Sequence, residues 1–265
     1  LGGISSKGLT LNPRLGNDPT RVAETPSGLL NSVGLQNPGL QAFLDHELPF
    51  MKTLGTAIIA NIAGHSLDEN VAMAERLDDT TVDGIELNLS CPNVNQGCMA
   101  FGSSAHLIEE VVRAVRQKTK KPLWVKLTPN VTSISDMALA AEAAGADAVS
   151  LINTLLGLAI DRKTRRPVLR NNTGGLSGPA VKPVALRMVW ETSKAVKIPV
   201  VGMGGITSGE DAIEFMLAGA TAIQVGTANL ISPTACQDIV NSMVDLAKQE
   251  QVENLDDYIG QLIPW

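Results

Sequence analysis

The chain has 265 residues, of which 44% are hydrophobic, and its formal net charge at pH 7 is −6. This length and composition fit one large domain spanning residues 1–265, and the acidic balance without a long basic stripe argues against a nucleic-acid partner. No apolar run approaches the ~20 residues of a membrane helix. Three cysteines in so long a chain suit a reducing compartment, so we expect a cytoplasmic protein without a membrane partner.

Short apolar strands alternate with helical stretches from residue 56 onward. Strands are predicted over 57–62, 84–89, 123–127, 148–152, 200–203 and 222–225. Helices are predicted near 67–77, 104–118, 133–144, 183–196, 208–218 and 233–249. Gly145 and Gly219 each end a helix just before a strand, as a C-terminal glycine does. Apolar strands that alternate with helices predict a parallel sheet covered by helices.

The number of strands favours a closed barrel over an open sheet. Residues 1–5 have the character of the end of a seventh strand. A (β/α)8 TIM barrel has eight strands in ~250 residues. Because the chain does not begin with methionine, we predict that the first strand of this barrel lies upstream of Leu1.

Two segments interrupt the alternation, 10–39 and 155–178. Both follow strand ends and are rich in glycine, proline and asparagine. We therefore predict inserted loops and hairpins at the C-terminal face of the strands, where barrel enzymes build their sites. The basic residues within 162–166 are predicted to form a solvated hairpin tip, with a docking patch as the alternative.

The strand predicted over 84–89 leads into a cysteine with asparagines on both sides, Asn88 and Asn93. Cys91 has four possible roles: nucleophile, base, metal ligand or packed side chain. A metal site is disfavoured, since six residues separate Cys91 from Cys98 and no histidine lies between them. As a base, a thiol with a reference pKa of ~8.5 would remove a carbon-bound proton with help from a nearby cation.

Lys126 lies in an otherwise apolar strand. An unpaired buried ammonium costs several kcal/mol to desolvate, so a lysine at this place needs an anionic partner. It either balances an anionic cofactor or substrate, or forms a structural ion pair with a carboxylate such as that of Glu86.

Several predicted strands end in an asparagine, namely Asn61, Asn88 and Asn153, and Asn93 follows shortly after one of them. A single such residue is often a turn residue or a helix cap. Several amides at one rim predict recognition of a planar ligand with both donors and acceptors, because an amide serves in both roles.

Two late strands both end in glycine-rich turns, 202–205 and 226–227. The first turn resembles a dinucleotide fingerprint, but its sixth position is Thr207, and no acidic residue follows about 20 positions later. Consecutive glycine turns after late strands match the phosphate site of barrel enzymes, where backbone N–H groups hold the anion. The alternative is that these glycines only make tight turns.

With these residues considered together, the chain resembles the class 1 dihydroorotate dehydrogenases from residue 4 to nearly its end. The motifs that carry the resemblance lie at 6–8, 31–35, 88–93, 125–127, 152–154, 174–178, 202–205 and 226–227. The resemblance implies a barrel that binds one FMN per chain and oxidises (S)-dihydroorotate to orotate in pyrimidine biosynthesis.

The resemblance also implies a role for each matched residue. Cys91 would be the base that removes the C5 proton while hydride passes from C6 to the flavin; class 2 enzymes have serine there, so Cys91 favours class 1. The substrate would be bound by Lys7, Asn31, Val33, Gly34, Leu35, Asn88, Asn93, Asn153 and Thr154. FMN would be bound by Lys7, Asn61, Asn88, Lys126, Ile152, Gly178, Gly204, Gly205, Gly226 and Thr227.

Segments 153–157 and 161–167 resemble subclass 1B, whose catalytic chains pair with a subunit carrying FAD and a [2Fe–2S] cluster and pass electrons to NAD+. This sequence has no cysteine cluster for an iron–sulfur centre and no dinucleotide fingerprint, so NAD+ reduction would require a second polypeptide. The resemblance implies a homodimer joined to such a subunit in a heterotetramer. The alternatives are a fumarate-dependent class 1A enzyme, a dihydropyrimidine dehydrogenase-like FMN barrel, and a non-catalytic flavin- or phosphate-binding barrel.

Overall fold

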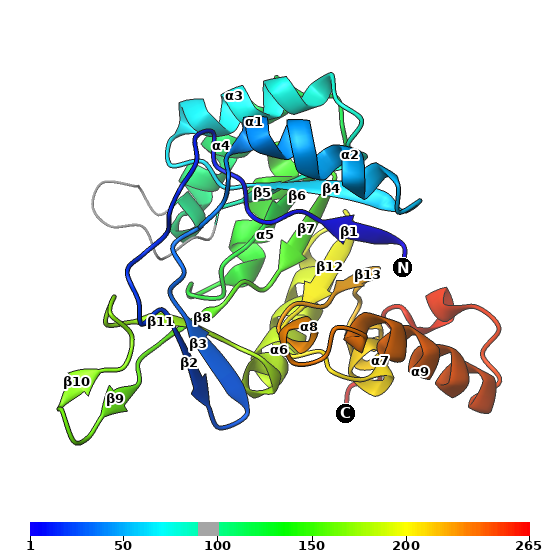
Figure 1. Ribbon diagram of the computed structural model, residues 1–265. Helices are drawn as coiled ribbons and strands as arrows, with labels where there is room; N and C mark the ends of the chain where they lie inside the picture. Colours follow the sequence, from blue (N-terminus) through cyan, green and yellow to red (C-terminus); the bar gives the residue numbers. More distant parts are fainter. Residues whose placement is uncertain (90–100) are drawn as a thin grey trace.

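The computed structural model describes residues 1–89 and 101–265, and a seven-stranded parallel sheet forms their centre (Figure 1). In spatial order the strands are β1 (Gly3–Ser5), β4 (Ala57–Ile62), β5 (Gly84–Asn88), β6 (Leu123–Lys126), β7 (Ala148–Leu151), β12 (Val200–Met203) and β13 (Ala222–Gln224). Each strand predicted after residue 56 is confirmed, with an end that differs by at most one residue.

In the seven-stranded sheet, a long helix lies between each strand and the next from β4 to β13, and another follows β13. The six long helices are α3 (Leu67–Asp78), α4 (Ala105–Arg116), α5 (Ile134–Ala143), α6 (Lys182–Ala195), α7 (Gly209–Leu217) and α9 (Ala235–Gln249). Three of them begin after a serine whose hydroxyl accepts a first-turn N–H, namely Ser66, Ser133 and Ser208. Gly145 and Gly219 end α5 and α7 with φ of 98° and 108°, in the left-handed region that glycine favours. The predicted helices are therefore confirmed.

The sheet curls into a barrel-like half-cylinder. Gln224 in β13 donates a hydrogen bond of 3.2 Å to Glu86 in β5, although β6, β7 and β12 lie between these strands in the sheet. Two side chains so far apart in a flat sheet could not meet, so they reach each other across the interior. In the described ranges, β1 and β13 are the two edges of the sheet. This architecture is consistent with the predicted TIM-barrel class.

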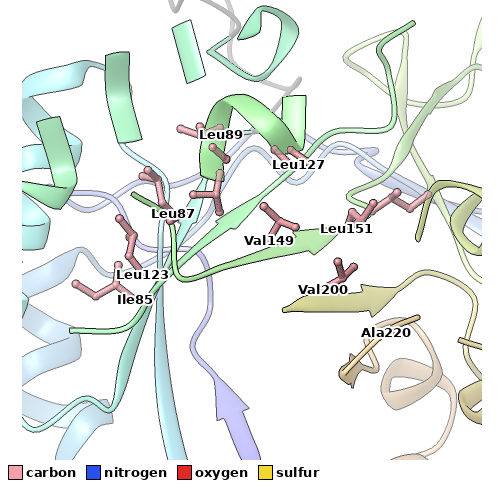
Figure 2. Close-up of a cluster of buried hydrophobic side chains, with 14 of the residues drawn as sticks. Ile85, Leu87, Leu89, Leu123, Leu127, Val149, Leu151, Val200 and Ala220 are labelled. Carbon is pink, nitrogen blue, oxygen red and sulfur yellow. The ribbon is translucent and has the colours of Figure 1, made fainter. Parts of the chain in front are cut away.

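Successive side chains of a strand point to opposite faces, and β5 shows how the sequence uses both. Ile85, Leu87 and Leu89 are 0%, 0% and 5% exposed and belong to the hydrophobic core that the sheet shares with its helices (Figure 2). Glu86 and Asn88 alternate with them and point to the inside of the curled sheet. The polar site is thus built on the reverse side of the strands that carry the core.

The two interrupting segments form a small antiparallel sheet of their own. Its order is β2 (Val22–Thr25), β3 (Gly28–Asn31), β11 (Gly174–Ser177) and β8 (Leu155–Gly157). Beyond β8, β9 (Ile160–Asp161) and β10 (Arg166–Pro167) form a projecting hairpin (Figure 1). Residues 162–166 at its tip are exposed, which confirms the predicted solvated tip.

The remaining helical pieces are short. They are α1 (Leu40–Ala42), the π-helix η1 (Phe43–Glu47), α2 (Leu48–Lys52), η2 (Phe101–Ser103), η3 (Pro179–Val181), α8 (Ala228–Ile231) and η4 (Leu255–Tyr258). The first three form one continuous stretch that buries Leu40, Phe43 and Met51 against the core, and the sequence patterns did not predict it. None of the helices in the described ranges combines the length and the apolar character needed to cross a bilayer.

Candidate active site

A cleft opens where the carboxyl ends of β6, β7, β12 and β13 meet the small antiparallel sheet. Nine residues predicted from the sequence line it: Lys126, Ile152, Asn153, Thr154, Gly178, Gly204, Gly205, Gly226 and Thr227. Residues from four different strand ends therefore share one cavity. The expectation that the site lies at the C-terminal face of the strands fits this position.

The glycine turns of the cleft are shaped by steric limits. Gly178, Gly204 and Gly205 have φ of 93°, 126° and 78°, which other residues rarely adopt. A Cβ on Gly205 would lie 2.8 Å from the Gly178 carbonyl oxygen and 2.9 Å from the backbone nitrogen of Lys182, so this turn packs directly on the chain leading into α6. A Cβ on Gly226 would meet nothing within 4 Å, because that position faces open space.

These turns leave hydrogen-bond donors for an anion. Within the described ranges, the backbone N–H groups of Gly205, Gly226 and Thr227 donate to no other residue. The hydroxyl of Thr227 donates to the Ser177 hydroxyl at 2.9 Å, which joins the end of β13 to the small sheet. Backbone N–H groups without a protein acceptor, next to hydroxyl groups, are what a phosphate requires. The residues present therefore fit a phosphate-bearing cofactor.

The lysine beside this turn is already engaged. Lys182 Nζ lies 2.6 Å from Asp211 Oδ1 and 2.9 Å from Glu214 Oε2. The hydrogen bond to Asp211 raises the pKa of Lys182, although burial opposes it. Burial alone would raise the pKa of Asp211, but hydrogen bonds from Lys182 and Thr207 hold it below its ordinary value. The charge of Lys182 is thus directed to two carboxylates.

The ion pair between Lys126 and Glu86 is confirmed, and the balancing of an anionic ligand by Lys126 stays a prediction. The Lys126 side chain is 18% exposed and lines the cleft, and its Nζ lies 3.8 Å from Glu86 Oε2. This distance is within the range of an ion pair but is too long for a hydrogen bond. The ammonium is therefore balanced from behind by a buried carboxylate while it faces the cavity.

Glu86 is fully buried and lies among polar side chains from several strands. Its Oε1 accepts hydrogen bonds from Ser150 Oγ at 2.8 Å and from Gln224 Nε2 at 3.2 Å, and its Oε2 accepts one from Asn61 Nδ2. Ser150 and Gln224 were not predicted as site residues from the sequence. Each is a polar residue inside an apolar strand, which is the same pattern that identified Lys126 and could have identified them.

Three of the predicted rim amides form a continuous chain, which we call the amide row: Asn61, Asn88 and Asn153. Asn88 Nδ2 donates to Asn61 Oδ1 at 3.4 Å, and Asn153 Nδ2 donates to Asn88 Oδ1 at 3.4 Å. The backbone N–H of Thr154 donates to Asn153 Oδ1 at 2.8 Å. The predicted meeting of amides is therefore confirmed for these three residues, and Cys91 and Asn93 lie outside the described residues.

The other predicted substrate residues are not among those that line the cleft, but two close approaches place several of them near the amide row. A Cβ on Gly8, next to Lys7, would lie 3.1 Å from Asn61 Oδ1 and 3.2 Å from Leu35 Cδ2. This glycine therefore allows the segment 33–35, with Val33, Gly34 and Leu35, to come close to the row.

Asn31 reaches the same region through the small sheet. It pairs with Gly175 in the β3–β11 register. A Cβ on Gly175 would clash with Thr154 Oγ1, so Thr154 packs directly on the backbone of β11. Asn31 is thus one strand away from the end of the amide row.

Three features follow one another around the carboxyl ends of the strands. The first is the set of N–H groups of Gly205, Gly226 and Thr227, which we call the anion cradle. The others are the Lys126 ammonium backed by Glu86, and the amide row. Together they define an α/β barrel whose donors fit a phosphate and whose amides fit a planar ligand. A family model described as dihydroorotate dehydrogenase matches residues 1–246. The chain belongs to the dihydroorotate dehydrogenase family, and the resemblance seen in its sequence is confirmed.

Three similar curated proteins carry the same name. The "Dihydroorotate dehydrogenase B (NAD(+)), catalytic subunit" of Geotalea uraniireducens is 53% identical over 264 residues, covering 99% of this chain and 87% of that protein. The same subunit of Citrifermentans bemidjiense is 54% identical over 263 residues (99% and 86%). That of Thermoanaerobacter pseudethanolicus is 53% identical over 262 residues (99% and 87%). The likeness thus covers nearly the whole chain and points to subclass 1B.

Proposed function

We propose that this chain is the catalytic subunit of an NAD+-linked dihydroorotate dehydrogenase, which oxidises (S)-dihydroorotate to orotate in pyrimidine biosynthesis. The observation that carries the proposal is the placement of Lys126 between the donor-rich glycine turns and the amide row. The glycine turns suit a flavin phosphate, the Lys126 ammonium suits the flavin ring, and the amide row suits a planar pyrimidine.

FMN is the cofactor that this donor set suits. Bound FMN supplies the acceptor for the hydride of the substrate. The residues that hold it are Lys7, Asn61, Asn88, Lys126, Ile152, Gly178, Gly204, Gly205, Gly226 and Thr227. The N–H groups of Gly205, Gly226 and Thr227 bind its phosphate, and the ammonium of Lys126 compensates negative charge at its ring.

The substrate lies against the amide row. Its ring and carboxylate are held by Lys7, Asn31, Val33, Gly34, Leu35, Asn88, Asn93, Asn153 and Thr154. Cys91, which follows β5 closely in sequence, would accept the C5 proton as its thiolate while a hydride leaves C6 of the substrate. Asn88, two residues after Glu86 on the interior face of β5, orients the ring for this step.

The electrons leave through a second polypeptide. The similar curated proteins are named catalytic subunits of NAD(+) enzymes, which supports a partner subunit. We propose that this partner carries FAD and a [2Fe–2S] cluster, as the resemblance to subclass 1B implies. The assembly is a heterotetramer built on a homodimer of this chain. Because the cysteine usage suits a reducing compartment, we place this assembly in the cytoplasm.

An acceptor panel tests the proposal. The chain is purified alone and together with its co-expressed partner, and the flavin absorbance is followed after anaerobic addition of dihydroorotate. The proposed function requires that dihydroorotate bleaches the flavin, and that NAD+ reoxidises it efficiently only when the partner is present. Efficient reoxidation of the lone chain by fumarate would assign class 1A instead, and a chain that binds no flavin would refute the enzyme assignment.

A further inference from the structure

The carboxylate of Glu86 is surrounded by hydrogen-bond donors. Asn61, Ser150 and Gln224 donate to it, and the ammonium of Lys126 lies beside it. An ionised carboxylate has about four acceptor positions and no donor. Three hydrogen bonds and one ion pair therefore engage both of its oxygens, and the side chain is 1% exposed, so water does not compete with these partners.

This carboxylate determines which way the amide of Asn61 points. Two acceptor oxygens that faced each other in the barrel interior would repel, so the NH2 group of Asn61 must face Glu86. Its Oδ1 then faces away from Glu86 and accepts from Asn88, and Asn88 Oδ1 in turn accepts from Asn153.

The hydrogen bond at the Asn153 end of the row requires the same amide orientation as the one at the Asn61 end. The backbone N–H of Thr154 can only donate, so the atom of Asn153 that meets it at 2.8 Å must be the oxygen. Amide oxygen and nitrogen exchange places when a side chain flips, and only hydrogen-bond partners decide between the two orientations. Here one acceptor-only group and one donor-only group fix the same direction from opposite ends.

We propose that Glu86 is a positioning residue that sets the order of donors and acceptors which the amide row presents to the substrate. This inference rests on the proposed function, since it assigns the pyrimidine ring to the row. The direction of the row decides whether oxygen or nitrogen of Asn88 and Asn153 lies at a given place beside the ring. Glu86 thereby acts on substrate recognition without belonging to the cavity lining.

The variant Glu86→Gln tests the inference with the chain in its native assembly. Glutamine has the same shape, but an NH2 group replaces one of the two carboxylate oxygens. Asn61 therefore no longer faces a group that can only accept hydrogen bonds. Orotate binding, measured by titration calorimetry on the flavin-loaded fraction, is expected to weaken about tenfold, because mismatched buried donors and acceptors are costly. The KM for dihydroorotate rises more than kcat falls, since ring placement is affected first.

A charge swap provides the decisive variant. In Glu86→Gln/Asn61→Asp the carboxylate moves to position 61, where it again forces the NH2 group of Asn88 to face it. The row keeps its direction, so orotate is expected to bind the flavin-loaded fraction clearly more tightly than it binds Glu86→Gln. Flavin content is measured in parallel, because Asn61 also belongs to the FMN-binding set. The matched control is Ser150→Ala, which removes one hydrogen bond from the same carboxylate but leaves its contact with Asn61, and it keeps near-normal affinity.

The outcomes distinguish a failure of the positioning role of Glu86 from a failure of the proposed function. Orotate binding by Glu86→Gln within twofold of wild type, or a swap that is no tighter than Glu86→Gln, overturns the positioning role while the wild type still turns over. If Glu86→Gln does not fold, the swap alone decides by its orotate affinity. A wild-type protein whose flavin dihydroorotate does not bleach overturns the proposed function, and this inference falls with it.

Discussion

Lys182 Nζ lies 2.6 Å from Asp211 Oδ1, and this contact ties the start of α6 to the start of α7 beside the turn at Gly205. Asp211 also accepts from the backbone N–H groups of Thr207 and Ser208 and completes the capping box of α7. One carboxylate therefore holds the chain on both sides of the anion cradle.

Replacement of Asp211 by asparagine is expected to reduce stability in a pH-dependent way. The folded pKa of Asp211 is lowered, so its stabilisation is present above the unfolded pKa and is lost as pH falls through the folded value. Asp211→Asn should lower the free energy of unfolding by about 1–2 kcal/mol at pH 7. The difference from wild type should shrink below about pH 4. Urea titrations at both pH values measure this, with the exposed Asp245→Asn as control.

Lys126→Met is expected to lower kcat about 100-fold, because it removes a fixed positive charge at the place where negative charge develops. The substitution also leaves Glu86 without its cation, so flavin content is measured in parallel. Lys118→Met is the matched control, since Lys118 forms an exposed ion pair with Glu75 on the helical surface. Equal turnover of the two variants would contradict the role of Lys126.

Two glycine-to-alanine variants should separate folding from cofactor binding. Gly205→Ala forces a Cβ against the Gly178 carbonyl at a φ of 78° and is expected to cost about 1–3 kcal/mol of stability. The Cβ of Gly226→Ala enters open space, so its melting temperature should remain near that of wild type while FMN affinity falls. Thermal melts with and without added FMN distinguish the two, and the proposed cradle is wrong if Gly226→Ala binds FMN normally.

Cys91→Ala should keep FMN and lose most turnover near neutral pH, because no thiolate remains to accept the C5 proton. The matched control is Cys236→Ala. Cys236 lies in the first turn of α9, is half-buried, and its Sγ donates to Asn229 Oδ1 at 3.2 Å. Stopped-flow reduction by dihydroorotate across a pH series measures the step. A Cys91→Ala variant with near-normal kcat would exclude this residue as the base.

The strands and long helices could be predicted because each leaves a periodic signal in the sequence. The helical stretch 40–52 could not, because it carries Pro49 in its interior and changes to a π-helix at Phe43–Glu47. Hairpins were predicted in both interrupting segments, but their union into one small sheet was not. Its strands have only three or four residues, and β3 pairs with β11 across more than half of the chain, which no local pattern encodes.

The parts of the site that depend on backbone conformation could be predicted from the sequence. The parts that depend on contacts between side chains of different strands were harder to predict. Gly204 and Gly205 were found because their turn follows a buried strand. Lys126 was found because charge is rare in such a strand, but Ser150 and Gln224 passed as ordinary polar residues. Their meaning depends on Glu86, which they reach from two other strands, and such a meeting exists only in three dimensions.

The pairing of β3 with β11 has a consequence for how the protein matures. Ser177 and Leu29, which face each other in this pair, are 148 positions apart in the sequence. Closing so long a loop is slow compared with forming the local strand–helix units. The wall that carries Asn31 and packs on Thr154 therefore closes only after the middle of the barrel exists, so a nascent chain acquires its core before it can recognise a ligand.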